Sequence, residues 1–416
     1  MLPVRPVKPP FVLTIGIAGF GLLAAAETWW LPSLRAPGID YYSAAAGDPI
    51  AKLQKRMDRG ETELEFDGKW GYLESLLKEL RIPESSQTLV FSKTSLQVAH
   101  IGPDHPRALY FNDDVYLGMV RGGLLEIAEA DPVKGAVFYT LEQKKAQHPR
   151  FVRRNDECLK CHFSANTLNI PGFLTRSVFA DSAGEPLPEA GSFLTDHRSP
   201  LSERWGGWYV TGTHGAARHM GNAVASGLNH RIDSERGANL TSLEGRIHPG
   251  AYPEPGSDIV ALMVLNHQVR MHNLFARLSY EARLGRSELP ATAEAAVRYI
   301  LFADEAPLRD KTAGTGAFRS DFEALGPFDS QGRSLRQFDL DHRIFRYPCS
   351  FLIYSPSFDA LPDAAKDLVY RRLFDVLSGE DRSGAFARLT PDLRSAILEI
   401  LIATKPALPA YFRNAE

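Results

Sequence analysis

The chain has 416 residues, enough for two or three domains or for one large hydrophobic core. Hydrophobic residues make up 44% of the sequence and charged residues 23%, which is ordinary for a globular protein. The formal net charge is -3, so the charge balance gives no indication of a nucleic-acid partner, and none is expected.

The first 30 residues (1–30) have the pattern of an export signal. Two basic residues, Arg5 and Lys8, precede an uncharged apolar run over residues 11–26 that ends on three alanines. A second interpretation keeps residues 11–30 as a membrane anchor, because two tryptophans follow the run where aromatic side chains meet a membrane surface. Both interpretations place the body of the protein in the periplasm or cell envelope, either soluble after cleavage or tethered.

Residues 31–60 read as a linker rich in Pro, Gly, Ala and Ser followed by a short helix, and residues 61–150 as a helix plus a β-rich region. In the β-rich part, short apolar runs alternate with turn-forming residues such as Asn112-Asp113-Asp114. The predicted strands cover residues 89–91, 108–111, 115–120, 124–128 and 136–141. This pattern predicts a small antiparallel sheet.

The stretch with the clearest chemistry is Cys158-Leu159-Lys160-Cys161-His162. Two thiols three positions apart, with a histidine directly after the second, have the spacing for covalent attachment of a c-type haem. The stretch resembles the attachment site of c-type cytochromes, and the resemblance covers these five residues alone. It implies one covalent haem c, held by thioethers from Cys158 and Cys161, with His162 as the proximal iron ligand.

Two other interpretations of the cysteine pair are open. One is a thioredoxin-like redox dithiol, although no βαβ unit is evident around it. The other is a zinc site, in which His162 and either a distant histidine or Cys349 complete the ligand set. The export pattern and the histidine of the motif favour haem, for which we expect an apolar cleft beside His162. With two cysteines on the haem, Cys349 is left alone and a disulfide framework is excluded.

A haem iron with a proximal histidine has one axial position left, and its occupant decides the function. Candidate distal ligands lie on a loop downstream of the motif and on a long predicted helix; they are His219, His214, His267 and Met220. The long irregular segment after the motif is suited to wrapping a flat cofactor, and Trp205 and Trp208 are its candidate packing residues. Candidate partners for haem propionates are the arginines 153, 154, 176, 204, 333, 336, 343 and 346.

Residues 151–256 thus form the predicted loop-rich haem c-binding region, and residues 257–416 a helical region that packs on it. The strongest predicted helix covers residues 259–283, with Ser257 as its expected N-cap. Further helices are predicted over residues 290–302, 364–378 and 391–403. The expected fold class is therefore mainly α with a small antiparallel β segment (α+β), with a helical C-terminal half.

Together these features predict an exported mono-haem c-type cytochrome that transfers electrons through its covalent haem to an unidentified redox partner protein. One alternative is a haem enzyme, peroxidase-like or a small-molecule oxidoreductase, in which His214 or His219 acts over an open distal site. Another is a haem-bearing sensor or assembly subunit without catalysis, whose helical half binds a partner. Added cyanide or carbon monoxide separates a closed electron carrier from a protein with an open iron site.

Overall fold

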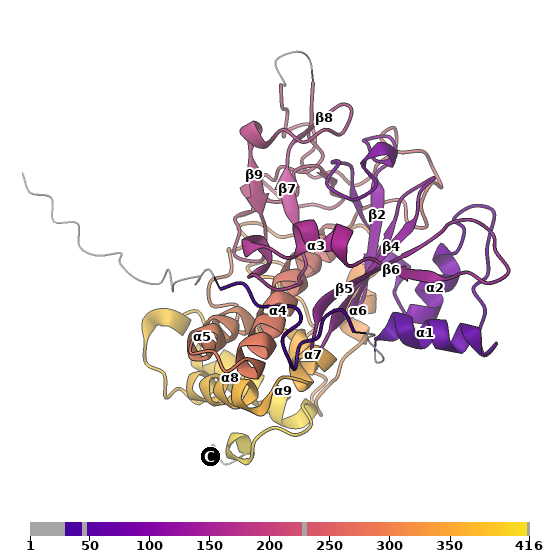
Figure 1. Cartoon of the computed structure of the whole chain (residues 1–416). Helices are drawn as coiled ribbons and strands as arrows, with labels where there is room; N and C mark the ends of the chain where they lie inside the picture. Colours follow the sequence, from indigo (N-terminus) through magenta and orange to yellow (C-terminus); the bar gives the residue numbers. More distant parts are fainter. Residues whose placement is uncertain (1–29, 44–47, 227–230, 414–416) are drawn as a thin grey trace, which may run out of the picture.

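The computed structural model describes the chain with the exception of four segments, residues 1–29, 44–47, 227–230 and 414–416. An antiparallel sheet of seven strands packs beside a group of helices, so the fold is mixed α+β (Figure 1). One continuous cluster of buried apolar side chains extends from Leu34 to Phe412 and joins the sheet to the helices.

The sheet is larger than the sequence predicted, because it includes strands from distant parts of the chain. Five strands coincide with predicted runs: β1 (Thr88–Val90), β2 (Arg107–Phe111), β3 (Val115–Met119), β4 (Leu125–Asp131) and β5 (Gly135–Leu141). The edge strands β6 (Phe151–Arg153) and β10 (Trp208–Tyr209) complete the order β10-β1-β2-β3-β4-β5-β6. Two smaller sheets pair β7 (Arg176–Val178) with β9 (Ser192–Leu194) and β8 (Ala180–Asp181) with β11 (Val224–Ala225).

Strand register gives the large sheet one closed face and a second, half-open face, on which most residues are buried and a few are half-buried or exposed. Along β4, Leu125, Ile127 and Glu129 are buried, whereas the alternate residues Glu126 and Ala128 are only half-buried. Because side chains alternate across a strand, residues that pair with Glu126 and Ala128 share their face. One row of this half-open face is therefore Leu109, Gly118, Glu126, Thr140 and Val152, and the next is Phe111, Tyr116, Ala128 and Phe138.

The closed face is covered in part by helix α1 (Pro49–Asp58), which a second helix, α2 (Leu73–Leu80), follows in the chain. Asp48 caps α1 and also accepts a hydrogen bond from the Tyr139 hydroxyl at 2.6 Å. The backbone N–H of Ile50 donates to the Glu129 carboxyl of β4 at 3.4 Å. These contacts bury two carboxyl groups, Asp48 and Glu129, against each other beneath the helix.

Burial, together with the neighbouring Asp48 carboxyl, raises the pKa of Glu129 to about 10. Its unfolded value is near 4.5, so the folded state holds a proton that the unfolded state releases above that pH. Stability therefore falls as pH rises from about 4.5 towards 10. We expect Glu129→Gln, which keeps a hydrogen-bond donor without an ionisable proton, to raise the free energy of unfolding at pH 8 by more than about 1.4 kcal/mol, the value of one pKa unit.

Urea denaturation at pH 5 and pH 8 measures this effect, because the gain from Glu129→Gln must shrink at the lower pH. The exposed Glu189→Gln serves as the matched control. A parallel pH dependence in wild type and Glu129→Gln would contradict the expectation.

The longest helix, α4 (Ile259–Arg283), has the predicted bounds, but its N-cap was predicted one residue too early. Ser257 is not available as a cap, because its hydroxyl accepts from Leu89 N–H at 3.0 Å and donates to the Tyr209 carbonyl at 2.6 Å. It thereby joins β1 to β10, and Asp258 caps the helix instead. The other helices are α3 (Asp156–His162), α5 (Leu289–Ile300), α6 (Phe318–Ala324), α7 (Pro356–Asp359), α8 (Asp363–Leu377) and α9 (Pro391–Thr404).

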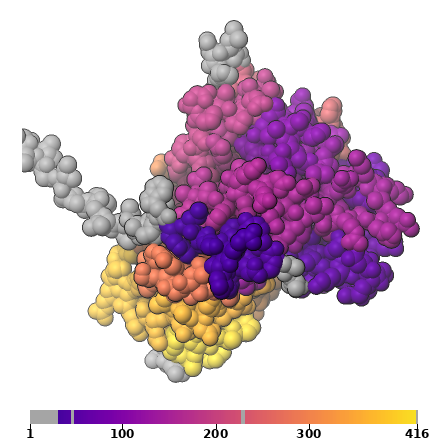
Figure 2. All heavy atoms as spheres, viewed as in Figure 1, coloured from indigo at the N-terminus to yellow at the C-terminus, as the bar shows by residue number. Residues whose placement is uncertain are grey.

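The first described segment, from Trp30, lies on the surface where the middle of the chain meets the C-terminal helices (Figure 2). The Trp30 ring is covered by the guanidinium groups of Arg277 and Arg286, each 4.7 Å from its centroid. The predicted signal or anchor otherwise lies outside the described residues. In the parts of the chain that the structure describes, no helix has the length and apolar character needed to cross a membrane.

Candidate cofactor site

The C-x-x-C-H motif forms helix α3, which was not predicted, and this helix lies against the half-open face of the sheet (Figure 1). Cys158 and Cys161 are free thiols, the first half-buried and the second exposed. Because they are three residues apart on a helix, their side chains share one side of it. Both sulfurs are therefore placed to bond to one ligand from the same direction.

His162 is held by the chain that follows it. Its Nδ1 lies 2.8 Å from the carbonyl oxygen of Gly172, and the Gly172 N–H donates to the His162 carbonyl at 2.9 Å. The imidazole also packs on the Phe138 ring, with centroids 4.7 Å apart. Burial lowers the pKa of His162 and so favours the neutral ring.

This hydrogen bond assigns the tautomer of His162. A carbonyl oxygen only accepts, so Nδ1 carries the proton and Nε2 has the free lone pair. No described residue hydrogen-bonds Nε2. Metal-binding histidines usually donate their second N–H to a carbonyl or carboxylate in this way, which fixes the ring and increases its basicity.

The sheet beside His162 carries one ion pair. Arg107 of β2 contacts Glu126 of β4 at 2.6 Å on the half-open face, and both charges act on the His162 pKa. Gly118, which the register places between Leu109 and Glu126, is buried, and the side chains of Leu109, Glu126 and Arg107 pack around it. The apolar cleft expected beside His162 is not seen among the described residues, where neither of the two main cavities is lined by α3.

The two other interpretations of the motif fit less well. Burial, followed by the Glu126 and Glu157 charges, raises the pKa of Cys158 to about 11, so its thiolate is scarce at neutral pH. A redox dithiol needs the opposite shift. A tetrahedral zinc ion needs four protein ligands, and no group of three or more His, Cys, Asp or Glu side chains able to hold a metal occurs within the described ranges.

Two of the predicted distal ligands have both ring nitrogens engaged. His214 donates from Nδ1 to the Ala217 carbonyl at 2.9 Å and accepts at Nε2 from the Asn239 N–H at 3.0 Å. His267 contacts His197 through Nδ1 and Ser350 through Nε2, each at 2.8 Å. Neither histidine therefore has a ring nitrogen available to bind iron in this conformation.

The remaining two candidates are buried on the loop after β10. His219 packs against Trp205 and His214, and its Nδ1 has no partner among the described residues. Burial, with His214 nearby, lowers the pKa of His219 to about 3. The Met220 sulfur accepts from the Ser177 hydroxyl at 3.4 Å. No described contact joins this loop to α3.

The predicted packing and propionate residues are also tied to other parts of the fold. Trp205 donates to the Asn266 side chain and Trp208 to the Arg176 carbonyl, both at 2.8 Å. Several of the arginines predicted to bind haem propionates form ion pairs in the described structure. Of these pairs, the one between Arg154 and Glu157, at 3.6 Å, involves a residue of α3. The sequence did not identify Gly172, Phe138 or the Arg107–Glu126 pair as part of the site. The only signal was the Pro171-Gly172 turn after the motif, which pointed to Gly172.

Comparison with family models, with curated proteins and with solved structures found no match for this chain.

Proposed function

We propose that the chain is an exported mono-haem c-type cytochrome that transfers electrons through a covalently bound haem. The observation that carries the proposal is the Nδ1–H hydrogen bond from His162 to Gly172, which leaves Nε2 without a hydrogen bond from any described residue, at the end of the helix that carries both thiols. A bare C-x-x-C pair needs no such preset histidine.

Cys158 and Cys161 are the residues that hold the cofactor in this proposal, and His162 supplies the proximal nitrogen. When bound, the haem supplies single-electron chemistry at its iron. The chain's own contribution is to fix the ring of His162 through Gly172 and Phe138, and to place the Arg107–Glu126 pair within electrostatic range of it. Hydrogen bonds and nearby charges of this kind set a reduction potential.

We further propose that residues 151–256, with their long connections between short strands, surround the cofactor, and that the protein resides in the periplasm or cell envelope. The support for this location is the pattern of residues 1–30 together with a cofactor class that is attached outside the cytoplasm.

Full-length protein produced with and without a cytochrome c maturation system tests the proposal. After denaturing electrophoresis, we expect haem stain on the protein band only from the matured preparation, because thioethers survive denaturation and axial ligands do not. A colourless band from matured, folded protein contradicts the proposal, as does a preparation that contains zinc in place of iron.

A haem protein with an open distal site is the second candidate function. It is favoured by the contacts of His214 and His267, whose nitrogens are all committed to other protein groups. Cyanide added to the oxidised protein, or carbon monoxide to the reduced protein, distinguishes the two. Spectra that shift on addition favour the open site, and unchanged low-spin spectra favour the electron carrier.

A further inference from the structure

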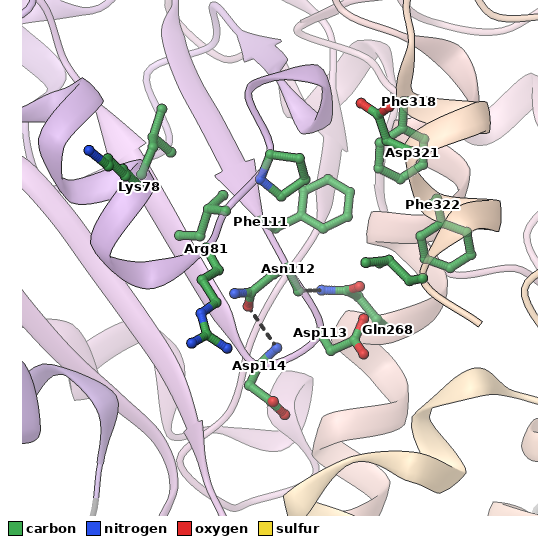
Figure 3. Close-up of a pocket in the computed structure, with 14 residues that line it drawn as sticks. Lys78, Arg81, Phe111, Asn112, Asp113, Asp114, Gln268, Phe318, Asp321 and Phe322 are labelled. Carbon is green, nitrogen blue, oxygen red and sulfur yellow. Dashed lines mark hydrogen bonds between the residues drawn. The ribbon is translucent and has the colours of Figure 1, made fainter. Parts of the chain in front are cut away.

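A cavity of about 540 Å³ lies away from α3, where α2, the β2–β3 turn, α4 and α6 meet (Figure 3). Its volume is within the range of 300 to 1,000 Å³, roughly, that is typical of small-molecule sites. None of the features discussed above uses it.

Most of the wall is apolar and aromatic. Phe111 and Phe318 lie with ring centroids 5.6 Å apart, and Phe318 and Phe322 with centroids 5.5 Å apart. The other apolar lining residues are Leu77, Ile82, Pro83 and Leu325. Such a wall favours a flat aromatic ligand, which gains both apolar burial and ring contacts.

Two of the three carboxyl groups in the lining are already engaged by the protein. Asp113 is paired with the buried guanidinium of Arg336, and Asp321 accepts from the Ser85 hydroxyl at 2.6 Å. The third, the Asp114 carboxyl, accepts no hydrogen bond from any described residue, and its Oδ1 is buried. An unpaired buried carboxyl is costly, so a ligand that bonds to it gains the full value of that interaction.

We propose that this cavity binds a small phenol-class molecule of one or two rings, with its ring among Phe111, Phe318 and Phe322 and its hydroxyl on the Asp114 carboxyl. Burial and the neighbouring Asp113 raise the pKa of Asp114 to about 7, so both protonation states occur near neutral pH. A hydroxyl both donates and accepts, and it therefore bonds to either state. A cationic amine fits less well, because Lys78 and Arg81 lie exposed at the rim.

The cavity is connected to the candidate cofactor site by one row of the half-open face. Phe111 pairs in the register with Tyr116, Tyr116 with Ala128 and Ala128 with Phe138, whose ring contacts His162. Three strand spacings separate Phe111 from Phe138, about 14 Å. The binding site does not rest on the proposed function, because no residue of α3 lines the cavity.

Isothermal titration calorimetry of the matured full-length protein with naphthol tests the site. We expect Leu325→Trp, at a lining position that is 63% exposed, to fill the mouth and weaken naphthol binding at least about tenfold. Asp114→Leu keeps much of the side-chain volume but removes both oxygens, and it should weaken naphthol binding by about tenfold, since the hydrogen bond to the hydroxyl is lost. Naphthylmethylamine should bind more weakly than naphthol.

Leu368→Trp and Asp104→Leu are the matched controls, at exposed positions outside the cavity, and both should bind naphthol as wild type does. Circular dichroism verifies folding, and a haem stain on the same samples reports the proposed function separately. The site is overturned if naphthol does not bind, or if Leu325→Trp binds it unchanged. The hydroxyl contact is overturned if Asp114→Leu binds naphthol as tightly as wild type or if the amine binds more tightly than naphthol.

Discussion

Replacing Cys158 and Cys161 together by alanine should abolish the haem stain of the matured protein. Two thioethers are the only covalent links that the proposed function provides, and Cys349, the remaining cysteine, is fully buried in the apolar core. Each single substitution leaves one thioether and should lower, but not remove, the stain. Densitometry of stained gels, normalised to total protein, measures the effect.

Cys349→Ala is the matched control, because it removes the third thiol without touching α3. It should keep the full stain, although it leaves a small cavity that lowers stability by about 1 kcal/mol. If the double variant still stains, the cofactor is attached elsewhere and the assignment of α3 is wrong. If Cys349→Ala loses the stain with its circular dichroism intact, the buried cysteine takes part in attachment and the assignment also fails.

Asp258→Ala should destabilise the fold by about 3 kcal/mol, the largest effect that we expect from one side chain outside α3. One carboxylate oxygen accepts from the first turn of α4, at Val260 and Ala261, at 2.8 and 3.3 Å. The other accepts from the backbone of Thr315 and Gly316, at 2.8 and 2.9 Å. Alanine leaves these four N–H groups without acceptors, in a site that is 5% exposed.

Urea denaturation followed by circular dichroism measures the loss. Asp258→Asn retains one acceptor oxygen and should lose about half as much stability, whereas the exposed control Asp104→Ala should change it by less than about 0.5 kcal/mol. A loss below about 1 kcal/mol for Asp258→Ala would contradict the view that this residue joins α4 to the 315–316 loop.

Several local elements were predictable because their signals are local. The predicted helix over residues 259–283 matches α4, and five predicted strands match β1 to β5, since periodicity and turn residues act over a few positions. The size of the sheet was not predictable in this way. β6 and β10 join it through hydrogen bonds to partners distant in the chain, and their runs of two or three residues carry no pattern of their own.

In the candidate site, too, the local features were predictable and the long-range contacts were not. The attachment residues follow from the spacing of Cys158, Cys161 and His162, but the choice between ring nitrogens required Gly172, which a turn brings back to the histidine. The predicted distal ligands are a second example of residues whose contacts the sequence did not reveal. His214 and His267 were attractive as unassigned histidines, yet the fold supplies each with two partners that no sequence pattern announces.

By itself the sequence determined the identity of the chemical groups: two thiols and an imidazole in C-x-x-C-H order, the helix and strand segments with strong periodicity, and an apolar N-terminal segment. Only the tertiary structure decided which polar groups are free. Within the described part of the chain, Nε2 of His162 and the Asp114 carboxyl have no hydrogen-bond partner, while most other buried donors and acceptors are paired. The physical reason is that a buried polar group must find a hydrogen-bond partner, and the fold decides which groups are near enough to serve.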